Sequence, residues 1–466
     1  DCTVTVSFMI LHTGANDKRM EEKMESQNVY EKPVTLKNIF KFVVPTIAMT
    51  VFMSFYTMVD GLFVSNLIGT KALSAINLTA PVIQLVTAIS TMLATGGSAV
   101  IMKKMGEHKV EEAREDFTFL ILVNVFVGFV MWGLGVWLTG PVFAAMNLSE
   151  DVVHYCREYL SRYLIFTVPI LLMNNFTLYM IASEKATLSL ICSVAGGVLN
   201  MILDYVLIAG FQMGIGGAAV ATGLGYSVTM VVGLVVFGKK KSLLHFQKPA
   251  FRLHVLANAA ANGSSEMATA LVTGIVTMMF NWTMLHYVGE DGVAAVTIIM
   301  YVLMFASSLY TGYSYGVAPM LSFYYGEQNH EKLKKLVAVS LKVIAKISVI
   351  TVAASFLLTK PLVSVFARPD NPVYDLAVTG NRICTAALVF IGFNIFASGM
   401  FTALSNGVVS AFLAFSRSFV FMLITMLVLP LLLGVNGIWL ATPVAELMAL
   451  FLSEALFLKN RKRYGY

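Results

Sequence analysis

The chain has 466 residues, of which 58% are apolar and only 12% are charged. Because soluble proteins carry about 25% charged residues, this composition excludes an ordinary soluble domain and indicates a polytopic membrane protein. The net charge of +6 gathers in short loops, so it is a topology signal and predicts no nucleic-acid partner.

Apolar segments separated by charged or turn-rich breaks predict an all-α membrane protein with twelve transmembrane helices. In chain order, we expect the helices at residues 39–67, 74–102, 117–138, 159–182, 187–210, 215–238, 255–287, 293–324, 336–359, 376–404, 407–432 and 437–458. Abundant glycine and helix-length apolar segments favour this fold over a β-barrel. The loops leave no room for a soluble domain, so we do not expect an enzyme.

Lysine and arginine concentrate in loops that share one side with the chain ends. The basic clusters lie within residues 103–114, 239–252, 332–335 and 459–463. Since positively charged loops stay in the cytoplasm, we expect a multi-pass protein of the cell (cytoplasmic) membrane with both termini cytoplasmic.

This topology predicts five consecutive parts. They are a cytoplasmic tail (1–38), an N-lobe of six helices (39–238), a cytoplasmic linker (239–254), a C-lobe of six helices (255–459) and a basic tail (460–466). Residues 1–19 begin without Met, and we interpret them as a disordered leader or a misplaced start.

The two lobes repeat one another at a constant offset of 220 residues. Identical pairs include Gly96/Gly316, Gly106/Gly326, Glu107/Glu327, Met180/Met400, Gly214/Gly434 and Thr222/Thr442. Six helices are an even number, so the repeats are parallel and related by a pseudo-twofold axis along the membrane normal. Two bundles that rock about a central cavity favour a transporter over a channel or a receptor.

Buried polar residues of the N-lobe form a candidate ion site. Asp60 lies in an uncharged apolar run, where a carboxylate costs about 2.5–3.5 kcal/mol on insertion scales. Asn200 and Asp204 are four residues apart and share one helix face. With Thr222 and Asn174 of neighbouring helices, they offer the oxygen ligands that Na⁺ prefers.

The same carboxylates are alternatively carriers of a proton. Two structural interpretations also stay open: Asp204 as a helix-end carboxylate near the outer surface, and Asp60 as a satisfied structural hydrogen-bonding group. Four cysteines and seven histidines show no ligand spacing, so we expect no metal beyond a possible Na⁺ at Asp60, Asn200, Asp204 and Thr222, and no cofactor.

These residues carry a family resemblance. Pro45, followed by Asp60 in Met-Val-Asp-Gly-Leu-Phe-Val, resembles the first helix of MATE (multidrug and toxic compound extrusion) transporters. Asn200-x-x-x-Asp204 with Thr222 resembles that family's N-lobe cation site, and Asn174 also matches DinF-like members. The resemblance covers residues 39–458, and Asn262-Gly-Ser-Ser-Glu266 is most similar to the MepA-like bacterial branch.

The resemblance implies an antiporter that exports amphipathic, often cationic drugs and toxic compounds against a flow of H⁺ or Na⁺ by alternating access. Its partners would be such small molecules and membrane lipid, and it would act as a monomer. Pro45 would bend the first helix, in keeping with the hydrogen bond that proline removes.

A substrate cavity is expected around Glu266, Tyr179, Met278 and Met304. Glu266 would neutralise a cationic substrate, whereas thioethers and aromatic rings suit varied greasy cations. The structural alternatives are a Glu266 paired with a basic residue, and Met or aromatic side chains that pack or face lipid.

The C-lobe departs from NorM-type members, because residues 376–404 contain no acid and offer Arg382 and Asn394 instead. Glu446 lies in mid-helix with no role implied by the resemblance, and Arg417 is expected to reach the interface. The alternative function is a flippase of lipid-linked oligosaccharides in the same superfamily. Such flippases often carry several cavity arginines, and Arg382 and Arg417 are the few candidates here.

Overall fold

The computed structural model describes the backbone of residues 30, 32–68, 70–145 and 150–466. It describes the side chains of the same residues except 60–75, 77 and 142–151. The leader expected at 1–19 lies outside these ranges.

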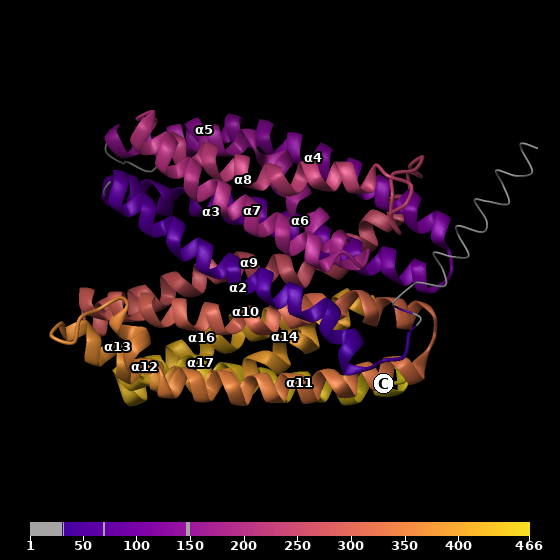
Figure 1. Cartoon of the computed structure of the whole chain (residues 1–466). Helices are drawn as coiled ribbons and strands as arrows, with labels where there is room; N and C mark the ends of the chain where they lie inside the picture. The colour runs from indigo at the N-terminus through magenta and orange to yellow at the C-terminus, as the bar shows by residue number, and fades with distance from the viewer. Residues whose placement is uncertain (1–29, 31, 69, 146–149) are drawn as a thin grey trace, which may run out of the picture.

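The described chain consists of long, roughly parallel helices joined by short connections (Figure 1). The N-terminal half contains α2 (Leu36–Ile68), α3 (Thr70–Gly106), α4 (Val110–Ala145), α5 (Glu150–Ile165), α6 (Thr167–Ala182), α7 (Ala186–Asp204), η2 (Tyr205–Gly210) and α8 (Gly214–Phe237). The C-terminal half contains α9 (Leu253–Tyr287), α10 (Glu290–Gly326), α11 (His330–Leu357), α12 (Thr359–Ser364), α13 (Pro372–Cys384), η3 (Thr385–Ala387), α14 (Leu388–Ala403), α15 (Gly407–Phe415), η4 (Ser416–Phe421), α16 (Met422–Leu433) and α17 (Val435–Tyr464).

The spanning segments confirm the helical plan. Eleven described segments are long and apolar enough to cross a membrane, and the bent pair α5–α6 makes up to twelve. This pair turns by 53° between Ile165 and Thr167, where a single straight helix was expected. Pro169 explains the break, because its missing N–H removes the helical hydrogen bond to the carbonyl of Ile165.

Two spans contain a π-helical segment, which the sequence did not predict. The segment η2 follows directly after Asp204, and η4 contains Arg417. Such segments are rare and frequently accompany functional sites. Both lie beside charged residues of the membrane interior.

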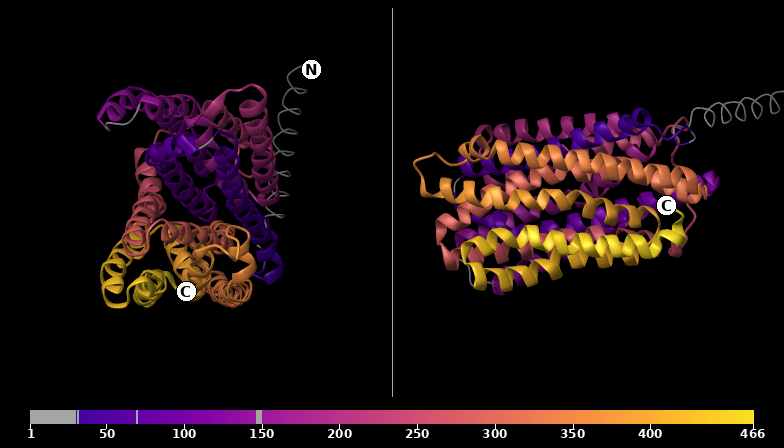
Figure 2. Two further views of the ribbon diagram at one scale, coloured as in Figure 1. Left: turned by 90° about the vertical axis from the view of Figure 1, so that its left-hand side faces the viewer. Right: turned by 90° about the horizontal axis from the view of Figure 1, so that it is seen from below.

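The helices form two bundles (Figure 2), which face each other through α2 and α3 on one side and α9 and α10 on the other. Glycines allow their backbones to touch. A Cβ atom on Gly96 would lie 1.8 Å from the carbonyl oxygen of Ala259, and one on Gly106 would lie 2.0 Å from that of Phe323. These contacts lie near the Gly106 end of α3, so the bundles are sealed together there.

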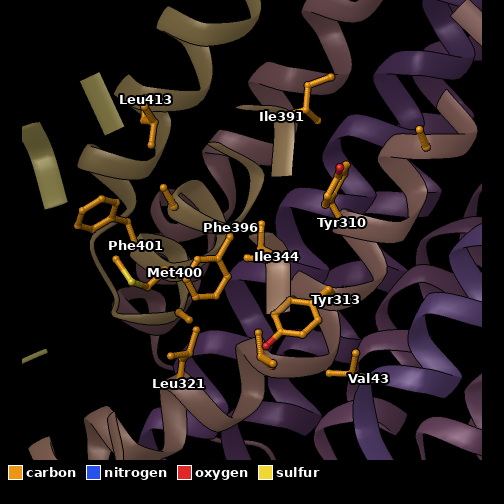
Figure 3. Packing of buried hydrophobic residues seen from close by; sticks show 14 of the residues in the cluster. Val43, Tyr310, Tyr313, Leu321, Ile344, Ile391, Phe396, Met400, Phe401 and Leu413 are labelled. Atoms are coloured by element: carbon orange, nitrogen blue, oxygen red, sulfur yellow. The ribbon is translucent and has the colours of Figure 1, made fainter. Parts of the chain in front are cut away.

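Buried aromatic residues organise the core of the second bundle (Figure 3). Tyr310 and Tyr313 of α10 point into it, and each satisfies its hydroxyl inside the bundle. The Tyr310 hydroxyl lies 2.6 Å from that of Thr351, and Tyr313 donates to Ser340 over 2.9 Å. Because a lipid environment offers no water, such internal partners hold α10 against α11.

Candidate transport site

A cavity of about 480 Å³ lies between the two bundles. It is lined by residues of α3, α6, α9, α10 and α14, so both halves of the chain build it. Its polar lining residues are Thr95, Ser98, Glu266, Ser314, Tyr315, Ser322 and Thr402. Glu266 is the acidic group among them, which makes the cavity suitable for a cation with apolar parts.

The segment around Glu266 is held by specific contacts on every side. Asn262 accepts a hydrogen bond from the backbone N–H of Gly407 over 3.1 Å, and the hydroxyls of Ser265 and Thr402 lie 3.2 Å apart. A Cβ atom on Gly263 would lie 1.8 Å from the carbonyl oxygen of Met92. The Asn262-Gly-Ser-Ser-Glu266 stretch therefore docks α9 onto α3, α14 and α15 and so positions the Glu266 carboxylate.

The predicted ion site is partly assembled. Asn200 of α7 donates from Nδ2 to the hydroxyl of Thr222 of α8 over 3.2 Å, and Thr222 donates to the carbonyl of Ala218 over 3.0 Å. Asn200 is 1% exposed and Asp204, the last residue of α7, is 0% exposed. In the described part of the structure, the Oδ1 atom of Asn200 has no hydrogen-bond partner.

A second cavity of about 300 Å³ lies inside the first bundle, next to this site. It is lined by Met53, Tyr56, Met173, Cys192, Ser193, Gly196, Gly197, Gly225, Tyr226 and Thr229. A Cβ atom on Gly225 would lie 3.0 Å from the Cβ atom of Asn200, which places the asparagine at the edge of the cavity. The small residues of α7 and α8 thus leave space beside the polar pair.

The side chain of Asp60 lies outside the described residues, although its backbone belongs to α2. That helix runs through Pro45 as one element. The hydroxyl of Thr46 bonds the carbonyls of Phe42 and Val43 over 3.1 and 2.9 Å. Thr50 donates to the carbonyl of Ser308 in α10 over 2.8 Å, which fixes this part of α2 against the other bundle.

Other predicted residues lie elsewhere. Asn174 donates to the hydroxyl of Ser90 over 2.9 Å. Tyr179 is fully buried in the first bundle, 5.0 Å from the ring of Phe117 between centroids.

Met278 is 72% exposed on α9, and Met304 is half-buried on α10. Neither these two residues nor Tyr179 belongs to the described lining of the central cavity, so of the predicted cavity residues Glu266 lines it.

The second bundle contains a polar network that the sequence analysis did not assemble. Arg417 of η4 donates from Nε to both carboxylate oxygens of Glu446 over 2.9 and 3.0 Å. Asn394 of α14 donates to the same carboxylate over 2.8 Å and accepts from Ser453 over 2.8 Å. The expectation that Arg417 reaches the interface is therefore wrong, because a buried carboxylate offers a better partner.

A sequence signal for this pair existed. Opposite charges in the middle of two consecutive apolar helices are expected to pair, because each is costly alone in the membrane. Arg417 and Glu446 are such a pair, and η4 packs against α17. Among the residues with described side chains, no group of three or more His, Cys, Asp or Glu has a metal-binding arrangement.

The family model for MatE matches the chain twice, over residues 45–206 and 267–428. Each half therefore carries one copy, as the internal repeat predicts. The multidrug export protein MepA of Staphylococcus haemolyticus is 21% identical over 95% of this chain and 97% of its own length. MepA of Staphylococcus aureus (strain NCTC 8325 / PS 47) is 20% identical over 91% of this chain and 94% of its own.

The fold also matches a solved structure described as an outward-facing conformation of a multidrug resistance MATE family transporter of the MOP superfamily. The TM-score is 0.85 at 23% identity, over 91% of this chain and 95% of that one. Two matched copies of the family model cover more than half of the residues. The chain belongs to the MatE family and is a multi-pass membrane transporter, not an enzyme.

Proposed function

We propose that this protein is a cation-coupled antiporter that exports amphipathic, often cationic compounds by alternating access. The central cavity of about 480 Å³ carries the proposal, because it joins the acidic side chain of Glu266 to a lining of apolar and hydroxyl-bearing residues between two repeated bundles. A hydrophobic cation fits such a lining, since it contributes apolar surface and a charge that the carboxylate neutralises. The name of the MepA relatives, multidrug export protein, agrees with this substrate class.

The coupling ion, H⁺ or Na⁺, is proposed to bind in the first bundle. The support is the buried Asp204, the Oδ1 atom of Asn200, which has no partner among the described side chains, and the hydroxyl of Thr222 on the adjacent helix. Asp60 belongs to this site in the proposal because it lies within an uncharged apolar run of the same bundle. Carboxylate, amide and hydroxyl oxygens are ligands for a hard cation, and a carboxylate is also a proton carrier.

The way the bundles meet supports alternating access. Their backbones touch at Gly96, Gly106 and Gly263, all toward one membrane side. The positive-inside rule predicts that both termini are cytoplasmic, and in the proposal the sealed side is therefore the cytoplasmic one. Transport then requires these glycine contacts to separate when the cavity opens inward.

Transport into everted membrane vesicles tests the proposal. Uptake of the fluorescent cation ethidium is followed after imposing either a pH gradient or a Na⁺ gradient, so that the same assay identifies the coupling ion. We expect Glu266→Gln to weaken ethidium uptake at low concentration. We expect Asp60→Asn and Asp204→Asn to abolish gradient-driven uptake.

Asp291→Asn is the matched control, because Asp291 is an exposed acid at the start of α10. It should transport like the parent. Gradient-driven uptake by Asp60→Asn and Asp204→Asn at the parent rate would refute the coupling site. Absence of ethidium uptake by the folded parent under either gradient would refute the export function for this class of substrate.

A further inference from the structure

The two bundles differ at one equivalent place, which the internal repeat makes visible. The helices α6 and α14 have the same length, 16 residues, and the positive-φ residues Glu184 and Ser405 follow them. Gly214 and Gly434 mark the start of the last helix of each bundle with φ of 56° and 58°. The first pair of markers is 221 residues apart and the second pair 220, so they align the bundles to within one residue.

To within one residue, Asn394 therefore corresponds to Met173 or Asn174, Arg417 to Gly196 or Gly197, and Glu446 to Tyr226. Met173, Gly196, Gly197 and Tyr226 all line the cavity of about 300 Å³ inside the first bundle. In the second bundle, the same place is occupied by the hydrogen-bonded network of Arg417 and Glu446. A tethered guanidinium thus stands where the other bundle keeps open space.

The network is tightly built. The side chains of Arg417 and Glu446 are 16% and 9% exposed. Asn394 donates from Nδ2 to both the backbone carbonyl and the carboxylate of Glu446, over 2.9 and 2.8 Å. Ser453 donates to Oδ1 of Asn394. Both the carboxylate of Glu446 and the amide of Asn394 therefore have hydrogen-bond partners. A buried ion pair of this kind persists only with such complete partners.

The network also reaches the central cavity electrostatically. The segment η4, which carries Arg417, packs against α9, on which Glu266 lies, and charges on packed helices act on each other through the low-dielectric interior. Along α9, η4 and the buried face of α17, the charged side chains are thus two carboxylates and one guanidinium, with a sum of one negative charge when all are ionised. The positive charge of Arg417 neutralises the negative charge of Glu446, which lies away from the cavity.

We propose that the Arg417–Glu446 pair is a specificity determinant, which sets the second bundle to accept substrates with one positive charge. In this proposal the pair does not contact the substrate. It determines the net charge around the place where a cation binds at Glu266. This inference rests on the proposed function, in that it assumes a cationic substrate in the central cavity.

Binding to the purified protein in lipid nanodiscs tests it with three probes of different charge. Tetraphenylphosphonium carries one positive charge, dibenzyl viologen carries two, and triphenylphosphine oxide is neutral. Removal of one nearby unit charge is expected to change the affinity for a monocation by about tenfold in a medium of intermediate polarity.

The variants follow from counting charges. Glu446→Gln raises the sum to zero and should weaken tetraphenylphosphonium binding although Glu266 is intact. Arg417→Gln lowers the sum to two negative charges and should favour dibenzyl viologen over tetraphenylphosphonium. The double variant Arg417→Gln/Glu446→Gln returns the sum to one negative charge and should bind both cations like the parent. The neutral probe should bind equally to all.

The outcomes separate this inference from the proposed function. If all variants weaken charged and neutral probes alike, the pair is merely structural and the inference fails. If a single variant does not fold by its melting curve, the double variant decides, because a loss of its parental charge preference overturns the inference. If the folded parent binds neither cation, the proposed function itself fails, and the inference with it.

Discussion

Asn200 donates a hydrogen bond from Nδ2 to the hydroxyl of Thr222 over 3.2 Å, across the contact between α7 and α8. Thr222 uses its own proton on the carbonyl of Ala218, so its oxygen accepts from Asn200. This orients the amide of Asn200 and leaves its Oδ1 atom buried without a partner among the described residues. A buried acceptor in this state is costly, and a bound cation would satisfy it.

Thr222→Val tests this arrangement, because valine keeps the shape and removes the hydroxyl. We expect the apparent affinity for the coupling ion to fall by about tenfold, the cost of one lost buried hydrogen bond. The measurement is the H⁺ or Na⁺ concentration dependence of ethidium export. Thr442→Val is the control, since Thr442 is the repeat counterpart in the second bundle and is similarly buried. Equal effects of both substitutions would contradict a coupling site in the first bundle.

Gly263→Ala tests the sealed contact between the bundles. A Cβ atom would lie 1.8 Å from the carbonyl of Met92, so the two backbones must move apart. We expect a cysteine introduced at Thr95 in the cavity to react several-fold faster with a membrane-impermeant thiol reagent added from the side of the termini. Gly274→Ala on the same helix would bring its Cβ atom within 4 Å of no described neighbour and should leave the rate unchanged. An unchanged rate in Gly263→Ala would mean that this contact does not seal the cavity.

His245 in the segment between the bundles predicts a pH dependence of stability. Burial lowers the pKa of His245 below its usual 6.5, assisted by the charges of Arg114 and Lys240 and opposed by Glu111 and by a hydrogen bond to the carbonyl of Ser242. The unfolded chain therefore binds more protons than the folded one between the two pKa values. Stability from this group is present above about pH 6.5 and is lost as the pH falls through the lowered pKa.

We expect His245→Gln to lack this pH-dependent contribution to stability. Its apparent melting temperature should fall about 1–3 °C less than that of the parent between mildly alkaline and mildly acidic buffer. Melting curves of the two proteins in the same detergent provide the comparison. Parallel curves across the pH range would exclude His245 as the titrating group.

Asp116→Asn tests the attachment of the same segment to the first bundle. The carboxylate is 0% exposed and lies 2.5 Å from Nζ of Lys104 and 3.1 Å from Nη1 of Arg252. Because Lys104 and Arg252 keep Glu112 and Glu115 as further partners, we expect a loss of about 1–3 kcal/mol in stability.

The matched control is Glu107→Gln. Its partner Lys109 has a side chain that is 53% exposed, and surface pairs contribute about 0–1 kcal/mol. Chemical denaturation of both variants measures the difference. A loss from Glu107→Gln as large as that from Asp116→Asn would show that burial is not the source of the effect.

Several features were readable without coordinates because they depend on local composition. Twelve apolar segments predict twelve spans, since each must satisfy its own backbone hydrogen bonds in lipid. The structure confirms eleven spans and a bent pair among the described residues. The proximity of Asn200 and Thr222 was also expected, because the first lies at a helix position that the family pattern pairs with the second.

Tertiary packing alone decided the rest. Periodicity cannot say which buried aromatic ring faces a cavity, and Tyr179 packs on Phe117 instead. It also cannot say whether Arg417 extends to the interface or turns inward, which depends on the distance to a carboxylate on another helix.

The sequence by itself thus determined the membrane class, the spans and the duplication, because these follow from hydrophobicity and internal similarity along one chain. The tertiary structure decided the partners: it joined Arg417 to Glu446 and placed Glu266 in a cavity built by both halves. The physical reason is that a buried charge is stabilised by whichever group packing brings within hydrogen-bond distance, and that group lies far away in the sequence.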